Sequence, residues 1–266
     1  LTLKQLVGQL SNLFKMNTFI SLVPENIWTT DLVYACLTLF LSGLIRGFSG
    51  FGSAMVNAPI LSLLWGPTVG IPVAALIELV PAMQLTPKAI PIAKWRLVWL
   101  MGIPALILIP LGSWLLITLP ADFIRRFVAL IVLMLVITLW SGWHYKGKRT
   151  TLSSILVGSC SGLLSGTTGM GGPPVILYLL AGKESANELR ANLVGYFTII
   201  LVGLMISFGF LGLFSESVIW RTLFLVPPFL TGIFIGARLF PFAAEKTYRN
   251  ISLLFLAISS LYVLVV

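Results

Sequence analysis

The sequence predicts an all-α polytopic membrane protein made of two repeats of five apolar segments each, and three observations support this class. First, 58% of the 266 residues are hydrophobic and only 9% are charged, whereas a soluble domain carries about 25% charged residues. Second, the apolar residues form long runs rather than the short alternating segments of a membrane barrel. Third, two glycine-rich stretches recur in phase along the chain.

The two glycine-rich stretches define the repeat, one running from Gly43 to Ser53 and the other from Gly162 to Pro174. Four glycines recur in phase, because 162 − 43, 166 − 47, 169 − 50 and 171 − 52 each equal 119. Later positions recur at an offset of 124, namely Pro104 with Pro228, Gly112 with Gly236, and Arg125 with Arg249. Chance similarity between apolar segments rarely keeps glycines in phase, so we infer an internal duplication.

The N-terminal stretch, residues 1–26, differs from the rest of the chain. Its apolar residues recur at helical spacing between lysine, glutamine and asparagine, which predicts an amphipathic helix lying on the membrane interface. Beyond it we expect ten apolar segments, at residues 27–47, 52–65, 68–87, 97–119, 124–142, 151–168, 173–182, 190–213, 219–239 and 247–266.

The second and seventh of these segments are too short to cross a membrane, since a full span needs about 20 residues. Both directly follow a glycine stretch. We interpret them as half-helices or re-entrant pieces, because irregular backbone at membrane depth must line a cavity or be buried in protein. The expected domains are therefore a first repeat over 27–142, a basic cytoplasmic linker over 143–150 and a second repeat over 151–266.

Loop charges predict the orientation of the chain. The net charge is +9, and the basic residues lie mostly in short loops, where they act as topology signals and contact anionic lipid rather than nucleic acid. The side richer in positive charge includes the linker and should be cytoplasmic, which places the C-terminus outside. If all five segments of a repeat cross the membrane, the second repeat starts on the opposite side and the two repeats are inverted. If the short segment of each repeat enters and returns on the same side, four segments cross and the repeats are parallel. Inversion is our preferred interpretation.

Each glycine stretch ends where a new helix is expected to begin. Glycine lets the chain leave helical geometry and brings backbone close to a ligand, and the free N–H groups of a helix N-terminus bind anions. The expected site residues are Gly50, Phe51, Gly52, Ser53 and Asn57 in the first half and Gly169, Met170, Gly171 and Gly172 in the second. The alternative is close helix packing, for which the four-residue spacings Gly43/Gly47 and Gly162/Gly166 are typical.

Arg46 and Glu78 lie deep inside apolar runs. A buried arginine costs at least about 2.5 kcal/mol on insertion scales, so it should face a cavity or a partner. Arg46 is therefore either the fixed cation for an anionic substrate or a structural charge that reaches the interface or pairs with Glu78. Glu78 in turn either carries a coupling proton or forms the salt bridge with Arg46.

The sequence lacks the residues that enzymatic catalysis and metal binding require. The single histidine, His144, lies in a basic loop, and Cys36 and Cys160 fit small buried hydrophobes, so no metal, haem or other cofactor is expected. The run Gly47–Gly50 matches the Gly-x-Ser-Gly pattern of intramembrane serine proteases, but no histidine base accompanies it. There is also no phosphate-binding loop. The sequence therefore predicts a protein that is not an enzyme.

At Gly162–Pro174, and again at Leu189-Arg190-Ala191-Asn192, the chain resembles the TauE/SafE family of sulfite exporters, also called the 4-toluene sulfonate uptake permease family. The resemblance covers about residues 30–266. It implies a secondary carrier of the inner membrane that moves sulfite, or sulfonates such as toluenesulfonate or sulfoacetate. The first stretch departs from the family pattern, because it has Gly52-Ser53-Ala54 where a Gly-Gly-Gly run is more usual.

Inverted repeats with paired helix breaks are the architecture of secondary transporters, whose sites lie near the midplane. The sequence therefore favours alternating access around an anion site, with two breaks donating N–H groups, Arg46 supplying charge and Glu78 coupling protons. The alternatives are an uncoupled channel or uniporter with the same site, and a membrane scaffold without transport. The expected partners are a small anion and membrane lipid, with a homodimer as one possible assembly.

Overall fold

The computed structural model describes residues 29–49, 52–141, 149–182 and 184–239, and within these ranges the ordered elements are helices. They are α3 (Thr30–Ser49), α4 (Ser53–Trp65), α5 (Pro67–Ala89), α6 (Trp95–Thr118), α7 (Ala121–Trp140), α8 (Thr151–Thr168), α9 (Gly172–Leu180), α10 (Ala186–Phe210) and α11 (Glu216–Leu239). The predicted all-α class is confirmed. Each of the first nine expected segments matches one of these helices to within four residues at either end.

Three expectations fall outside the described residues. These are the amphipathic N-terminal stretch 1–26, the last segment 247–266, and most of the linker 143–150. Among the described helices, five are long and apolar enough to cross a membrane, namely α3, α5, α6, α10 and α11. The two helices that follow the glycine stretches are short, as expected, with 13 residues in α4 and 9 in α9.

Local sequence determines where the second half begins its helices. Thr150 caps α8 with its side-chain oxygen, which accepts a hydrogen bond from the Ser153 N–H at 3.1 Å. Ser185 caps α10 in the same way, and Glu188 returns a contact to the Ser185 backbone at 3.0 Å. These reciprocal pairs satisfy N–H groups that otherwise lack a partner in the first helical turn.

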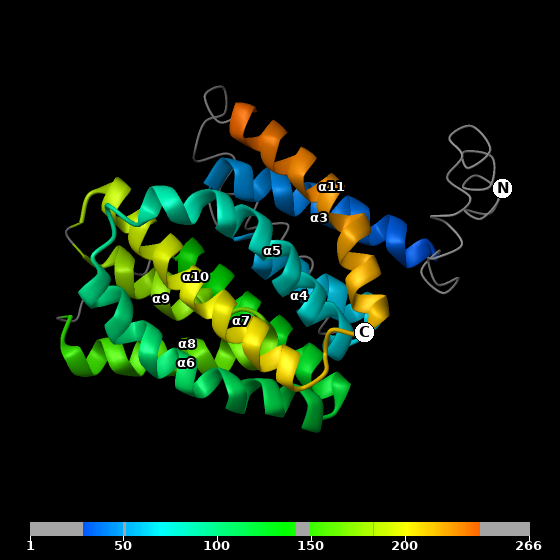
Figure 1. Ribbon diagram of the computed structural model, residues 1–266, viewed down its shortest axis with the longest axis horizontal. Coiled ribbons are helices and arrows are strands. Elements are labelled where there is room, and N and C mark those ends of the chain that lie inside the picture. The colour runs from blue at the N-terminus through cyan, green and yellow to red at the C-terminus, as the bar shows by residue number, and fades with distance from the viewer. Residues whose placement is uncertain (1–28, 50–51, 142–148, 183, 240–266) are drawn as a thin grey trace.

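Two pairs of helices form opposite sides of the molecule. Helix α3 packs along α11, and α6 packs along α8, with α4, α5, α9 and α10 between the two pairs (Figure 1). Glycines make both contacts close. A Cβ at Gly43 would overlap the carbonyl oxygen of Phe229, and one at Gly162 would overlap that of Ala105. For these glycines the structure supports the packing alternative rather than a ligand contact.

The two glycine contacts correspond position by position. Gly43 and Gly162 differ by 119 residues, and their partners Ala105 and Phe229 differ by 124, which are the offsets of the sequence repeat. The next turn repeats the pattern, with Gly47 against Ile233 and Gly166 against Ile109. The first helix of each half therefore packs against a late helix of the other half, with matching residues in contact.

Replacing Gly162 with alanine should destabilise the protein, because the added methyl group would meet the backbone of α6 rather than a flexible side chain. Overpacking of this kind costs about 1–3 kcal/mol, which thermal unfolding of the purified protein in detergent can detect. Gly209→Ala is the matched control, since its Cβ would meet only the Phe214 ring, at 3.9 Å. Equal melting temperatures for the two variants would show that the close contact is not needed.

Candidate functional site

Left-handed glycines mark both helix breaks. Helix α8 ends at Thr168, and Gly169 follows with φ +71°, its N–H donating to the Ser165 carbonyl at 2.8 Å. In the first half, Gly52 has φ +98° and immediately precedes α4. Residues with a side chain rarely adopt these angles. The sequence therefore needs glycine at these two positions for the chain to turn from one helix into the next.

Both breaks border one cavity, with a volume of about 100 Å³. Gly52 and Met55 line it at the start of α4, and the second break lines it from Gly169 to Gly172. Helices α5 and α10 form the walls between them. Two segments that lie 119 residues apart in the sequence therefore meet around the same space.

The second break offers few backbone donors. Pro173 and Pro174 occupy the first turn of α9 and carry no N–H, and the Met170 N–H already donates to the Thr168 hydroxyl at 3.2 Å. The N–H groups of Gly171 and Gly172 are those that remain at this end of the helix. An anion bound here would consequently need further donors from side chains.

A charged pair stands beside the first break. Arg46, at the end of α3, forms a salt bridge with Glu78 on α5, and their side chains are only 15% and 9% exposed. Ser53 joins them, because its hydroxyl accepts from Arg46 Nη1 at 2.9 Å and donates to Glu78 Oε1. Arg46 and Glu78 both line the cavity. The pairing of these two charges is thus present in the structure.

The Arg46 guanidinium retains unused donor capacity. Its Nε atom is buried and has no hydrogen-bond partner among the described residues. Buried polar atoms in proteins are nearly always paired, so an unpaired one at a cavity wall indicates a place for a ligand. The geometry is therefore compatible with a second, substrate-binding role for the same side chain.

The remaining predicted residues are distributed unevenly. Asn57 is fully buried on α4 but does not line the cavity, and neither of its amide atoms has a partner among the described residues. Gly50 and Phe51 lie outside the described residues. Of the expected site, the structure therefore gathers Gly52, the glycines of the second break, Met170, Arg46 and Glu78 at the cavity, with Ser53 bonded to the charged pair.

Sequence reasoning did not assign three polar residues of the cavity lining to the site, namely Ser165, Arg190 and Thr198. Ser165 lies on α8 with a buried hydroxyl that has no partner among the described residues. Arg190 lies in the first turns of α10, where it is exposed at the cavity edge. In the sequence repeat, Ser165 is the position equivalent to Arg46, because the two residues are 119 positions apart. Arg190 lies near the start of an apolar run, with Glu188 and Asn192 two positions away on either side, so it did not stand out as a charge deep inside an apolar segment.

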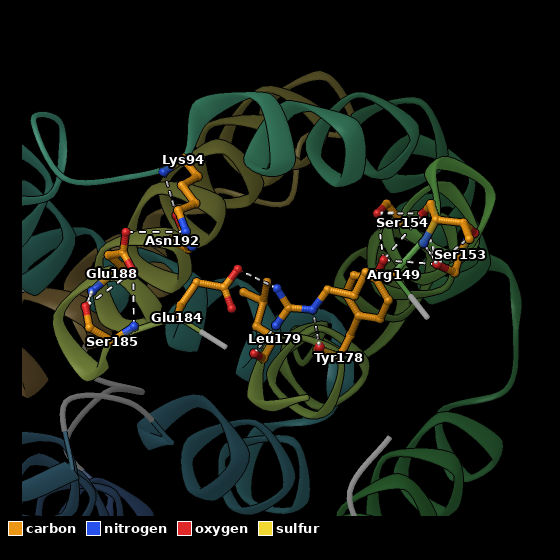
Figure 2. Close-up of polar contacts among 11 residues, drawn as sticks. Lys94, Arg149, Ser153, Ser154, Tyr178, Leu179, Glu184, Ser185, Glu188 and Asn192 are labelled. Carbon is orange, nitrogen blue, oxygen red and sulfur yellow. Dashed lines mark hydrogen bonds and ion pairs between the residues drawn. The ribbon is translucent and has the colours of Figure 1, made fainter. Parts of the chain in front are cut away.

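An arginine also holds the far end of α9. Arg149 donates from Nε to the Tyr178 carbonyl at 3.2 Å and from Nη2 to the Leu179 carbonyl, while Nη1 binds Glu184 at 2.6 Å (Figure 2). A cation at a helix C-terminus satisfies the last carbonyls and complements the helix dipole. The short helix that begins at the cavity is therefore fixed at its other end by this contact.

We expect Arg149→Ala to destabilise the protein by about 3 kcal/mol, because the change leaves a largely buried carboxylate on Glu184 without its cation and removes one donor from each of two carbonyls at the end of α9. Differential scanning fluorimetry in detergent should then give a melting temperature lower by roughly 6–10 °C. The exposed Arg126 on α7 provides the control, and Arg126→Ala should melt with the unaltered protein. A melting temperature for Arg149→Ala within a degree or so of that control would contradict the anchoring role.

Five of the described helices are long and apolar enough to cross a membrane, and two segments far apart in the sequence meet around one cavity between the helices, as in a membrane transporter. The chain belongs to the sulfite exporter TauE/SafE family, whose sequence model matches residues 35–263. This confirms the resemblance predicted from the glycine motifs. Comparisons with curated proteins and with solved structures found no match. Family membership, together with the apolar helices, makes the chain a multi-pass membrane protein and implies transport of a sulfur-containing anion.

Proposed function

We propose that the protein is a proton-coupled secondary transporter of small sulfur anions in the inner membrane. Its substrates would be sulfite or a sulfonate such as toluenesulfonate or sulfoacetate. The observation that carries the proposal is that both helix breaks border the same cavity, with the Arg46–Glu78 pair in its wall. Backbone N–H groups at the breaks and one guanidinium supply the donors that a sulfur oxyanion requires.

The charged pair suggests how proton and anion are coupled. The carboxylate of Glu78 is bonded to Arg46 Nη1 in this structure, so it competes with any anion for the same guanidinium. A proton on Glu78 cancels its charge and releases Arg46 to bind the substrate through Nη1 and the free Nε. The site is neutral before and after the exchange, because the anion replaces the carboxylate charge. This avoids the cost of leaving a buried charge without a partner.

The helix contacts support two structurally equivalent halves. The α3–α11 contact and the α8–α6 contact use matching residues at the repeat offsets. We infer that the halves are inverted repeats and that they rock about the cavity, exposing it to each side of the membrane in turn. Gly43, Gly47, Gly162 and Gly166 would keep each packed pair rigid during this motion.

Binding of anions to the purified protein tests the proposal. We would measure melting temperatures with sulfite, sulfate, toluenesulfonate, sulfoacetate, taurine and lactate, since a ligand of the folded state stabilises it by mass action. A ligand at 100 times its Kd should add about 2.7 kcal/mol. Sulfite or a sulfonate should stabilise the protein, and Arg46→Gln should remove the effect. A protein that responds to none of the sulfur anions would contradict the proposed function.

A further inference from the structure

Among the described residues, three charged side chains line the cavity, and the charges of two of them cancel. Arg46 and Glu78 form a salt bridge, which leaves Arg190 as the uncompensated charge among the described lining residues. No described carboxylate forms an ion pair with Arg190, and the other described salt bridges pair Glu188, Asp122 and Glu184 with different cations. The net positive charge of the cavity wall therefore comes from α10.

Arg190 also lies at the more exposed end of the cavity lining. Along α10, exposure falls from Arg190, which is exposed, to Leu204, which is 3% exposed. Along α5 it falls from the half-buried Leu85 to Ala74, also 3% exposed. The lining of the cavity is therefore more exposed near Leu85 and Arg190 than near Ala74 and Leu204.

We propose that Arg190 forms an outer anion site at the mouth of the cavity, which attracts the sulfur oxyanion before it reaches Arg46. This inference rests on the proposed function. An entering anion meets Arg190 while the guanidinium of Arg46 is still held by Glu78. A single fixed charge at the mouth of an apolar cavity raises the local concentration of the oppositely charged substrate.

Sulfite uptake into proteoliposomes at several ionic strengths tests this role. For Arg190→Gln, the KM for sulfite at low salt should rise about tenfold, and its dependence on ionic strength should flatten, while the maximal rate stays within about twofold. Lys88→Gln is the matched control, because Lys88 is an exposed cation at the end of α5 that does not line the cavity. Its KM and salt dependence should equal those of the unaltered protein.

The outcomes separate this inference from the proposed function. If the unaltered protein transports sulfite but Arg190→Gln and Lys88→Gln share the same KM at every ionic strength, the outer site is wrong and the proposed function stands. If the unaltered protein shows no saturable uptake of sulfite or of toluenesulfonate, both are wrong. If Arg190→Gln fails to fold, the KM of Arg190→Lys tests the outer site instead, because lysine keeps the positive charge. Its low-salt KM should remain within about threefold of the original, and a larger rise would overturn the charge-based role.

Discussion

Replacing Arg46 with glutamine should lower the rate of sulfite uptake into proteoliposomes by at least about 30-fold. The change removes the guanidinium that binds both Glu78 and, in our proposal, the substrate. Truncating one partner of a buried, hydrogen-bonded charge pair typically costs about 2–5 kcal/mol, which corresponds to a factor of this size or larger. Arg126→Gln, which removes an exposed charge outside the cavity, should leave uptake unchanged.

A double variant distinguishes substrate binding from a purely structural salt bridge. If Arg46 only neutralises Glu78, then Arg46→Gln combined with Glu78→Gln removes both buried charges and should restore uptake. If Arg46 holds the substrate, the double variant should remain inactive although it folds as well as the unaltered protein. Recovered uptake in the double variant would therefore remove Arg46 from the substrate site.

The second large effect is expected for Glu78→Gln, which should bind toluenesulfonate equally well at pH 6 and pH 8. In the unaltered protein, binding should weaken as pH rises, by up to about tenfold per pH unit for one linked proton. The reason is that ionised Glu78 holds Arg46 against the anion, whereas glutamine never carries the competing charge. Toluenesulfonate suits this test because its own charge is constant over the range.

The other charged groups among the described lining residues do not confound this comparison. Arg46 and Ser53 contact Glu78 directly, and Arg190 is the other charged residue among the described lining residues. None of these loses its charge or hydrogen-bonding group between pH 6 and pH 8, because arginine stays protonated and serine is neutral. Glu216→Gln, an exposed acid at the start of α11, should keep the pH dependence of the unaltered protein. Persistent pH dependence in Glu78→Gln would assign the coupling proton to another group.

The helices were predictable because the solvent of this chain is lipid. Apolar run length sets each segment, and glycines at Gly52 and Gly169 mark where helical geometry must stop. The short lengths of α4 and α9 follow from the same two signals. Packing was harder to assign from sequence, because a glycine that permits a tight helix contact and one that borders a ligand look alike. Gly162 and Gly171 lie in one stretch, yet only Gly171 lines the cavity.

The site was only partly predictable because sequence does not give the rotation of a helix about its axis. Asn57 is polar and lies one turn beyond Ser53, but it is buried and does not line the cavity. The partnership of Arg46 and Glu78 joins residues 32 positions apart and was one of two alternatives until the structure brought them together. Arg190 contributed to the family resemblance but was not assigned to the site, because a charge near the start of a helix is usually solvated.

The central claim is that proton movement drives the sulfur anion across the membrane, and accumulation against a gradient tests it most directly. Proteoliposomes with an interior one pH unit more alkaline than the bath would be given labelled toluenesulfonate and, in parallel, labelled sulfite, with protein-free liposomes as the blank. One proton carried with one monovalent anion predicts an internal concentration about ten times the external one. Uptake of both anions that stops at equal concentrations would contradict coupled transport and favour an uncoupled channel or uniporter of the same fold.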